Sequence, residues 1–298
     1  MITVIAIVTD GLVYAAWLFV VAIGLSLIFG VMKILNVAHG AFYAFGAYSA
    51  ATAIGLYYDR GLPAVGGYLA IASAAIATGL IMGYALERTL LRKVYGRDEV
   101  VVVLVTYALF LILEDVLILI WGTDGKSAYQ PYSDAGSFTV GGLPLSVYDI
   151  GLVCFAGLLA IAASYTIKKT TFGRLLTAVI FDRETAAAFG VDVTRVYART
   201  FIVGAVLGAL GGALTAPKIS VVPGIGVEVI VLAFAVVAIG GMGSIEGALT
   251  GALIVGLFRA AAVHLVPNLE LFAIYAVMAT VLVFRPYGLF SRAQPRKI

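Results

Sequence analysis

Polar residues that could do chemistry in a hydrophobic setting gather where one apolar run of this sequence is interrupted. Residues 24–48 read GLSLIFGVMKILNVAHGAFYAFGAY, an apolar run broken midway by Lys33, Asn36, His39 and Gly40. Unsatisfied backbone groups in hydrocarbon cost several kcal/mol each, so a break is tolerated only inside protein or beside a water-filled path. Two interpretations follow. Asn36 and His39 hold the break together, or, with Tyr43, they offer a small neutral or zwitterionic solute hydrogen-bond donors and acceptors.

A second group of ionisable residues interrupts the apolar run at 100–121. Residues such as Glu114 and Asp115 are functional candidates by default, because burying a charge in a membrane is costly. Adjacent residues point about 100° apart on a helix, so the two carboxylates cannot share one small site. Either they are solvated or paired with Arg259 or Lys218, or Glu114 lines the same path as the break. Arg259 itself lies deep in its apolar run and is expected to pair with a carboxylate.

Motifs for nucleotide binding and catalysis fail on their spacing. Residues 125–127 (GKS) resemble the end of a P-loop, but Ile120 stands where the earlier glycine belongs. The glycines near 241–243 do not match a dinucleotide fingerprint either. His39 and His264 have no partner at metal-ligand spacing, and no serine lies in a nucleophile elbow. We therefore expect no enzyme, metal or cofactor, and if ATP is used, another subunit must bind it.

The composition is that of a polytopic helical membrane protein. Of 298 residues, 62% are hydrophobic and 12% charged, against roughly a quarter charged in soluble domains, and mean hydropathy is +1.09. The net charge of +3 is concentrated in a few loops, so it indicates orientation rather than a nucleic-acid partner. The single cysteine, Cys154, excludes an intrachain disulfide and is expected to be inert packing.

We predict an all-α bundle in which residues 1–298 form one transmembrane domain. A spanning helix needs about 20 apolar residues. On that basis there are about nine spans (eight to ten), near 11–31, 37–57, 64–86, 100–121, 148–167, 198–216, 225–242, 247–265 and 268–284. The second and seventh are interrupted by glycine and could be re-entrant. No basic segment precedes the first span, which is expected to be retained rather than cleaved.

The distribution of lysine and arginine predicts the orientation. Basic residues concentrate in the loops 87–99 and 168–197 and in the tail (Arg285, Arg292, Arg296 and Lys297), whereas loop 122–147 has a single lysine. Because basic loops stay inside, we expect the N-terminus outside and the C-terminus inside.

Small residues recur at four-residue spacing in three places. This spacing puts each set on one helix face, where a neighbouring backbone can approach closely. Such a face either packs tightly against a neighbouring helix or slides along it during transport, and the sequence does not distinguish these two roles. The sets are Ala75/Gly79/Gly83, Gly204/Gly208/Gly212 and Gly243/Gly247/Gly251.

The loop at 168–197 is predicted to contain one short amphipathic helix from Arg174 to Phe189. Apolar positions include Ala178, Phe181, Ala187, Ala188 and Phe189, charges fall at Asp182, Arg183 and Glu184, and Gly190 suits a C-terminal cap. Such a helix lies on the membrane surface or inserts into a groove on a soluble partner. Charges of both signs and a small alanine face favour the partner.

Four segments together resemble a known family. GVMKILNVAHGAFYAFGAYSA, FGRLLTAVIFDRETAAAFGVDVTRV, AVVAIGGMGSIEGALTGALIVG and VFRPYGLFSR look like the signature blocks of the permease subunits of bacterial branched-chain amino acid ABC importers. The AHG at 38–40 resembles the first of that family's two paralogous permeases. The blocks cover about a third of the chain.

The resemblance implies a multi-pass permease of the bacterial inner membrane. It would work with a second homologous permease, two cytoplasmic ATP-binding subunits and a periplasmic solute-binding protein. It implies that the segment from Arg174 to Gly190 couples to the ATPase and that the break faces the translocation path. Interruptions at 33–40 and 240–247, one in each half, would suit an internal repeat.

Other functions stay open at this stage. Related permeases of the same pattern serve urea and short-chain amides. An ion- or proton-coupled secondary transporter would use Glu114 and Asp115 as its coupling site, and a passive channel would need no energy source. Dependence of uptake on ATPase subunits separates these possibilities.

Overall fold

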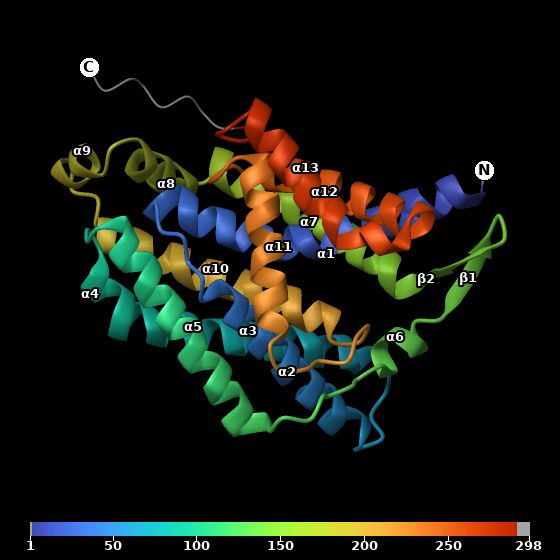
Figure 1. Cartoon of the computed structure of the whole chain (residues 1–298). Coiled ribbons are helices and arrows are strands. Elements are labelled where there is room, and N and C mark those ends of the chain that lie inside the picture. Colours follow the sequence, from blue (N-terminus) through green and yellow to red (C-terminus); the bar gives the residue numbers. More distant parts are fainter. Residues whose placement is uncertain (1, 291–298) are drawn as a thin grey trace.

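The computed structural model describes residues 2–290 and shows a helical bundle with one small hairpin (Figure 1). The long helices are α1 (Ile2–Met32), α2 (His39–Tyr58), α3 (Val65–Leu86), α5 (Glu99–Trp121), α7 (Val147–Lys169), α10 (Val193–Thr215), α11 (Ile225–Gly240), α12 (Ile245–Leu265) and α13 (Glu270–Phe284). The short helices are α4 (Arg92–Val94), α6 (Gln130–Asp134), α8 (Thr171–Phe181) and α9 (Arg183–Ala188). A π-helical turn (Glu87–Leu91) joins α3 to α4, and a 3-10 turn (Pro267–Leu269) precedes α13.

The hairpin is antiparallel and follows from two glycines. Strands β1 (Ser137–Val140) and β2 (Leu143–Ser146) pair with Ser137 opposite Ser146. The connecting Gly141 and Gly142 both have positive φ, at 59° and 87°, which a two-residue turn matched to strand twist requires.

Helix α1 forms the centre of the bundle. It is apolar all round, as expected of a buried helix, and 67% of its most apolar window is buried. It packs most extensively against α12 and α10, and α10 in turn packs against α2 and α3. The break and the glycine-rich faces therefore lie in the best-packed part of the molecule.

The peripheral helices present apolar side chains outward. In the spans containing α3, α5 and α7, only 22%, 28% and 11% of the most apolar window is buried. Within the described residues six helices are long and apolar enough to cross a membrane, and 171–181, 225–240 and 272–284 are shorter apolar helices. These exposed faces identify the surface that meets lipid. Cys154 lies on such a face of α7 and is exposed, so the expectation that it is packed was wrong.

Each predicted span coincides with a helix, and polytopic helical architecture is confirmed. Examples are the predicted 100–121 against α5 and 225–242 against α11. The elements α4, α8 and α9, which carry the basic loops, gather at one end of the bundle, at the left of Figure 1. The hairpin and the N-terminal end of α1 lie at the opposite end. Of the basic tail, Arg292, Arg296 and Lys297 lie outside the described residues.

Candidate functional site

The interruption between α1 and α2 is a non-helical link at residues 33–38. Helix α1 stops where Lys33 takes a left-handed backbone, with φ of 57°, a conformation uncommon for a residue other than glycine. Its amide donates to the carbonyl of Phe29 at 2.9 Å, and α2 opens with the amide of His39 donating to the carbonyl of Asn36 at 3.2 Å. The link leaves several backbone groups without helical partners.

Thr106 of α5 supplies partners for part of that link. Its Oγ1 accepts a hydrogen bond from the amide of Val37 at 3.3 Å and lies 3.2 Å from the carbonyl oxygen of Leu35. The side chain is fully buried. One hydroxyl therefore contacts the backbone of the link on both sides of Asn36, a role that the sequence analysis missed.

Asn36 and His39 are completely enclosed. Both have 0% exposure, and Nε2 of His39 lies 3.0 Å from the carbonyl oxygen of Val21 in α1. This carbonyl can only accept, so Nε2 carries the proton. Within residues 2–290, Nδ1 of His39 and both amide atoms of Asn36 lack hydrogen-bond partners. Buried polar atoms of this kind call for a specific explanation, and a solute that uses them is one.

Close backbone contacts surround these two side chains. A Cβ added at Gly24 would lie 2.9 Å from Cε1 of His39, and one at Gly208 would lie 3.0 Å from the same atom. At the start of α2, a Cβ on Gly40 would lie 2.4 Å from the carbonyl oxygen of Gly226 in α11. The imidazole thus fits between glycines of α1 and α10, and the first turns of α2 and α11 touch through their backbones.

Glu114 lies at the same junction. Its Oε2 accepts a hydrogen bond from the amide of Gly224, the N-cap of α11, at 3.1 Å. Its Oε1 would lie 2.7 Å from a Cβ on Gly226 and has no partner among the described residues. A carboxylate is favourable at a helix N-terminus, where unpaired amides and the helix dipole are positive. Glu114 therefore reaches the α2–α11 contact.

The predicted partners of Glu114 and Asp115 are engaged elsewhere. Arg259 pairs with Glu270 of α13, and Lys218 pairs with Asp149 at 2.5 Å. The prediction that one of these cations pairs with Glu114 was wrong, because each is held by another carboxylate. The expectation that Arg259 pairs with a carboxylate is confirmed.

The predicted path residues do not line an open channel in this conformation. Asn36, His39 and Tyr43 have at most 1% exposure, and Gly40 is buried. The backbone of Tyr43 packs against Gly212, where an added Cβ would lie 1.9 Å from its carbonyl oxygen. His39, Gly40 and Tyr43 lie in the first turns of α2, packed against neighbouring helices, and Asn36 lies in the link just before them. A path through these residues therefore requires the helices to move apart.

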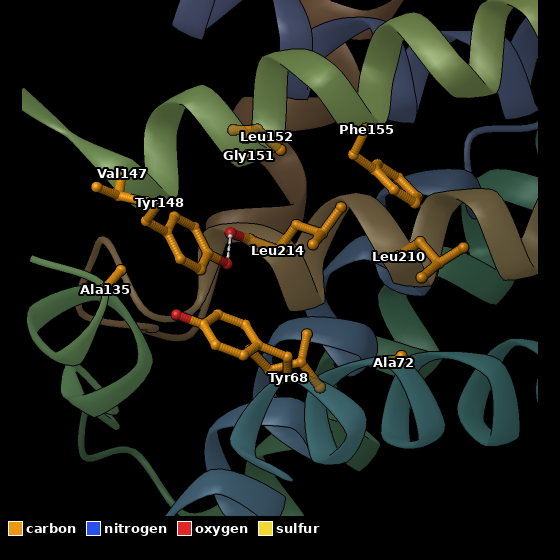
Figure 2. A pocket seen from close by; sticks show the side chains of 11 residues that line it. Tyr68, Ala72, Ala135, Val147, Tyr148, Gly151, Leu152, Phe155, Leu210 and Leu214 are labelled. Atoms are coloured by element: carbon orange, nitrogen blue, oxygen red, sulfur yellow. Dashed lines mark hydrogen bonds between the residues drawn. The ribbon is translucent and has the colours of Figure 1, made fainter. Parts of the chain in front are cut away.

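A cavity of about 400 Å³ lies elsewhere, between α3, α7 and α10 (Figure 2). Its walls are apolar apart from two tyrosines: the hydroxyl of Tyr148 donates to the carbonyl of Leu214 at 2.8 Å and that of Tyr68 to the carbonyl of Pro131 at 3.0 Å. Both hydroxyls are thus satisfied by protein. The predicted path residues are not part of its lining.

The three sets of small residues lie at helix contacts. Gly204 meets Ile28 and the backbone of Gly24 in α1, Gly208 and Gly212 meet α2, and Gly79 meets the backbone of Val206. The third set also lies at close contacts, but Gly243, with φ of 86°, is in the turn before α12, so the expectation that all three of its glycines share one helix face was wrong. Gly243 approaches Gly30, Gly247 approaches Gly240, and Gly251 approaches the carbonyl of Val236.

The predicted amphipathic segment at 174–189 is two helices rather than one. The predicted helix over 174–189 is broken at Asp182, which separates α8 from α9. Asp182 is the N-cap of α9: its Oδ1 accepts from the amides of Glu184 at 2.9 Å and Thr185 at 3.0 Å, and its Oδ2 from the hydroxyl of Thr185 at 2.6 Å. These bonds, the hydroxyl of Thr185 first, lower the pKa of the carboxyl below its usual value. The cap competes successfully with helix continuation.

Helix α9 ends at the predicted glycine. Gly190 has φ of 83°, its amide donates to Ala187, and the amide of Val191 donates to Ala186 at 3.1 Å. This pair of bonds is the Schellman motif.

The surface around α9 is open and partly apolar. Phe181 and Phe189, which flank α9, are 73% and 85% exposed. The remaining predicted coupling positions are also exposed, namely Arg174, Ala178, Asp182, Arg183, Glu184, Ala187 and Gly190. Leu176 and Val179 are buried beneath them. The pair of aromatic side chains gives this end of the protein a protruding apolar surface of the kind that marks interaction sites.

The rejected nucleotide motif has a different structural role. The amide of Lys126 donates to the carbonyl of Val221, and the reverse bond has the same length of 2.8 Å. The segment is therefore an extended bridge rather than a phosphate loop. Among the described residues, no group of three or more His, Cys, Asp or Glu side chains could hold a metal ion.

Comparison with known proteins decides the family. A sequence profile of the family described as branched-chain amino acid transport system, permease component, matches residues 7–283. The chain belongs to this family. The resemblance drawn from the four sequence blocks is thereby confirmed, and the chain is a transport permease.

Curated relatives match this permease over nearly its full length. BraD of Pseudomonas aeruginosa, a high-affinity branched-chain amino acid transport system permease protein, is 28% identical and the match covers 97% of this chain and 96% of BraD. LivH of Escherichia coli K12, named in the same way, is 27% identical over 98% of this chain and 95% of LivH. A probable LivH from Methanocaldococcus jannaschii is 25% identical over 93% and 90%.

Among solved structures, PsaBC from Streptococcus pneumoniae in complex with Fab is similar at a TM-score of 0.49 and 13% identity, covering 92% of this permease and 89% of that chain.

Proposed function

We propose that this permease forms the translocation path of an ABC importer for branched-chain or related small amino acids. The observation that carries the proposal is the family match over residues 7–283, supported by relatives named as branched-chain amino acid permeases. In this proposal the chain is a single permease domain of about nine spans in the bacterial inner membrane. Its N-terminus lies outside and its C-terminus inside, and its two halves are related by an internal repeat.

The proposed path runs along the junction of α2, α5 and α11. Asn36 and His39 contribute unpartnered polar atoms, Glu114 a partly unpartnered carboxylate, and Gly40 the close contact that must open. Tyr43 continues the same face of α2. Because all of these lie behind helix contacts, solute passes only when α2 and α11 separate, which is the behaviour that an energised permease needs.

The proposed motor is outside this chain. Residues 168–197 are the coupling loop, with Asp182, Arg183 and Glu184 at its centre and the exposed Phe181 and Phe189 as its apolar contacts. Two ATP-binding subunits would receive α9, a second homologous permease would complete the membrane part, and a periplasmic solute-binding protein would deliver the solute and dominate its selection.

Purification from membranes tests the assembly. We expect the chain to bring down a second permease and two ATPases, and ATP-dependent uptake to require both ATPases. Uptake of solute that persists after the ATPase genes are deleted would refute the importer and favour an ion-coupled transporter.

A variant of Glu114 addresses that alternative directly. The alternative has one observation in its favour, the unpartnered Oε1 of Glu114. Glu114→Gln would abolish ion-coupled uptake, whereas in the importer it should leave the requirement for ATP unchanged. A substrate of another class, such as urea or a short-chain amide, would be found by binding to the solute-binding protein.

A further inference from the structure

A second cavity joins three parts of the chain that the proposed function treats separately. It measures about 200 Å³ and is lined by the break, by the loop between α4 and α5, and by α9. Each of these segments contributes one cation: Lys33 from the break, Arg97 from the loop and Arg183 from α9. We call this cavity the inner pocket.

The cations of the inner pocket have no carboxylate of their own. Within the described chain none of the three forms an ion pair, although Lys33 lies 5.8 Å from the centre of the Phe29 ring. Only one carboxylate, Glu99, lines the same space. Like charges brought together at one site are unfavourable without a counter-ion, so the pocket is suited to an anion.

The floor and wall of the pocket define its shape. Met32, Ile34 and Val102 are buried and apolar, while Tyr95 and Tyr197 stand edge to face with ring centres 5.3 Å apart. The hydroxyl of Tyr95 is already committed, since it donates to Glu87 at 3.1 Å. The pocket therefore has charged residues at its opening and apolar residues at its base. This arrangement suits an anion whose charged group is attached to an apolar portion.

The chemistry of the rim favours phosphate. Two guanidinium groups and one ammonium offer many donors, and guanidinium groups bind phosphate oxygens in pairs. Glu99 can accept a hydrogen bond from a hydroxyl beside that phosphate.

The position of the pocket favours a lipid as the source of the phosphate. It adjoins the first turns of α5, where Val100, Val101 and Leu104 are 65%, 45% and 61% exposed, so the lipid-facing surface leads into it. Basic pockets between transmembrane helices on the cytoplasmic side bind anionic headgroups.

We propose that the inner pocket binds the phosphate group of an anionic phospholipid of the cytoplasmic leaflet, bridging the break and α9 through Lys33, Arg97 and Arg183. The bound headgroup would hold α9 against the link between α1 and α2, so that a movement of the coupling loop reaches the break. The proposal rests on the orientation and the coupling loop of the proposed function, and it does not depend on which solute is carried.

The test measures lipid retention by the purified full-length chain. Phosphatidylglycerol and phosphatidylcholine with the same acyl chains are added in detergent, and bound lipid is read by native mass spectrometry and by the shift in apparent melting temperature. Lys33→Gln, Arg97→Gln and Arg183→Gln are each expected to weaken phosphatidylglycerol binding about tenfold, the loss of one charge-assisted bond. Lys93→Gln is the matched control, because Lys93 is an exposed cation of the neighbouring α4 that does not line the pocket.

Two further measurements keep the result decisive. Arg97→Lys keeps the charge and should retain most of the binding, which separates charge from folding if Arg97→Gln is unstable. Inorganic phosphate added to lipid-free protein separates the two sources. Stabilisation by phosphate alone, with no preference for phosphatidylglycerol, would assign a soluble phosphate and overturn the lipid. Equal retention of phosphatidylglycerol by all variants, or of both lipids by the wild type, would overturn the site.

Discussion

The contact between Gly212 of α10 and the backbone of α2 makes a quantitative prediction. A Cβ at position 212 would lie 1.9 Å from the carbonyl oxygen of Tyr43, whereas ordinary contact begins at 3.4 Å. Gly212→Ala therefore forces the two helices apart by about 1.5 Å, the difference between these distances. The obstructing atom belongs to the backbone of a buried helix and cannot rotate away.

The expected cost is that of overpacking a tight core, about 3 kcal/mol. At roughly 2–4 °C per kcal/mol, the apparent melting temperature of the detergent-solubilised protein should fall by about 6–12 °C. Uptake should fall further, since the displaced face carries the proposed path. Thermal unfolding followed by size-exclusion chromatography measures the first effect, and transport in reconstituted vesicles the second.

Two matched glycines provide controls. Gly157 of α7 has nothing within 4 Å of an added Cβ, so Gly157→Ala should be neutral or stabilise the helix by up to about 1 kcal/mol. The loss of stability in Gly208→Ala should lie between those of the other two variants, because the atoms nearest to an added Cβ are side-chain atoms of His39 at 3.0 Å and 3.1 Å. If Gly212→Ala were as stable as Gly157→Ala, the close approach of α2 and α10 would not be a constraint and our account of the bundle would be refuted.

Three other predictions concern the break and the coupling segment. Thr106→Val leaves the amide of Val37 without its buried partner, so it should cost about 1–3 kcal/mol and speed hydrogen exchange at 35–38; unchanged exchange would contradict the bridging role. Asp182→Ala should fray α9, while Asp182→Asn keeps the cap. Because the pKa of Asp182 is lowered, the stability that its carboxylate gives α9 is complete above the ordinary aspartate pKa and is lost as the pH falls through the folded pKa. Hydrogen exchange of the α9 amides, measured against pH, will test this. Phe181→Ser together with Phe189→Ser should reduce recovery of the ATPase without changing the melting temperature, and full recovery would exclude these side chains as contacts.

The sequence pattern predicted the helices well, because a long apolar run in a membrane can satisfy its backbone groups only as a helix. The nine apolar runs became helices at nearly the predicted residues, and the small-residue sets lie at helix contacts. The break at 33–40 was also visible, because polar residues and glycine stood in an apolar run.

The partners within the site could not be predicted, because they come from distant segments. His39 lies against the carbonyl of Val21, and Thr106 reaches a link some 70 residues earlier in the chain. Backbone carbonyls have no sequence signature, and Thr106 is a single hydroxyl in an apolar helix. The division of the segment at 174–189 by Asp182 did have a signal in the sequence, an aspartate able to cap the residues that follow it. Periodicity of the apolar positions concealed it.

The contact between Gly40 and Gly226 has a mechanical consequence. Neither glycine has a side chain that would hold the two backbones apart, and Ile230 and Glu114 border the contact from the side. The first turns of α2 and α11 can therefore pivot about this point, but sliding along either axis brings the carbonyl of one helix against the Cβ atoms of the other. Such a joint converts a push on one helix into a change of crossing angle. The crossing angle would therefore change first, before the two backbones part at Gly40, which is the separation that the proposed path requires.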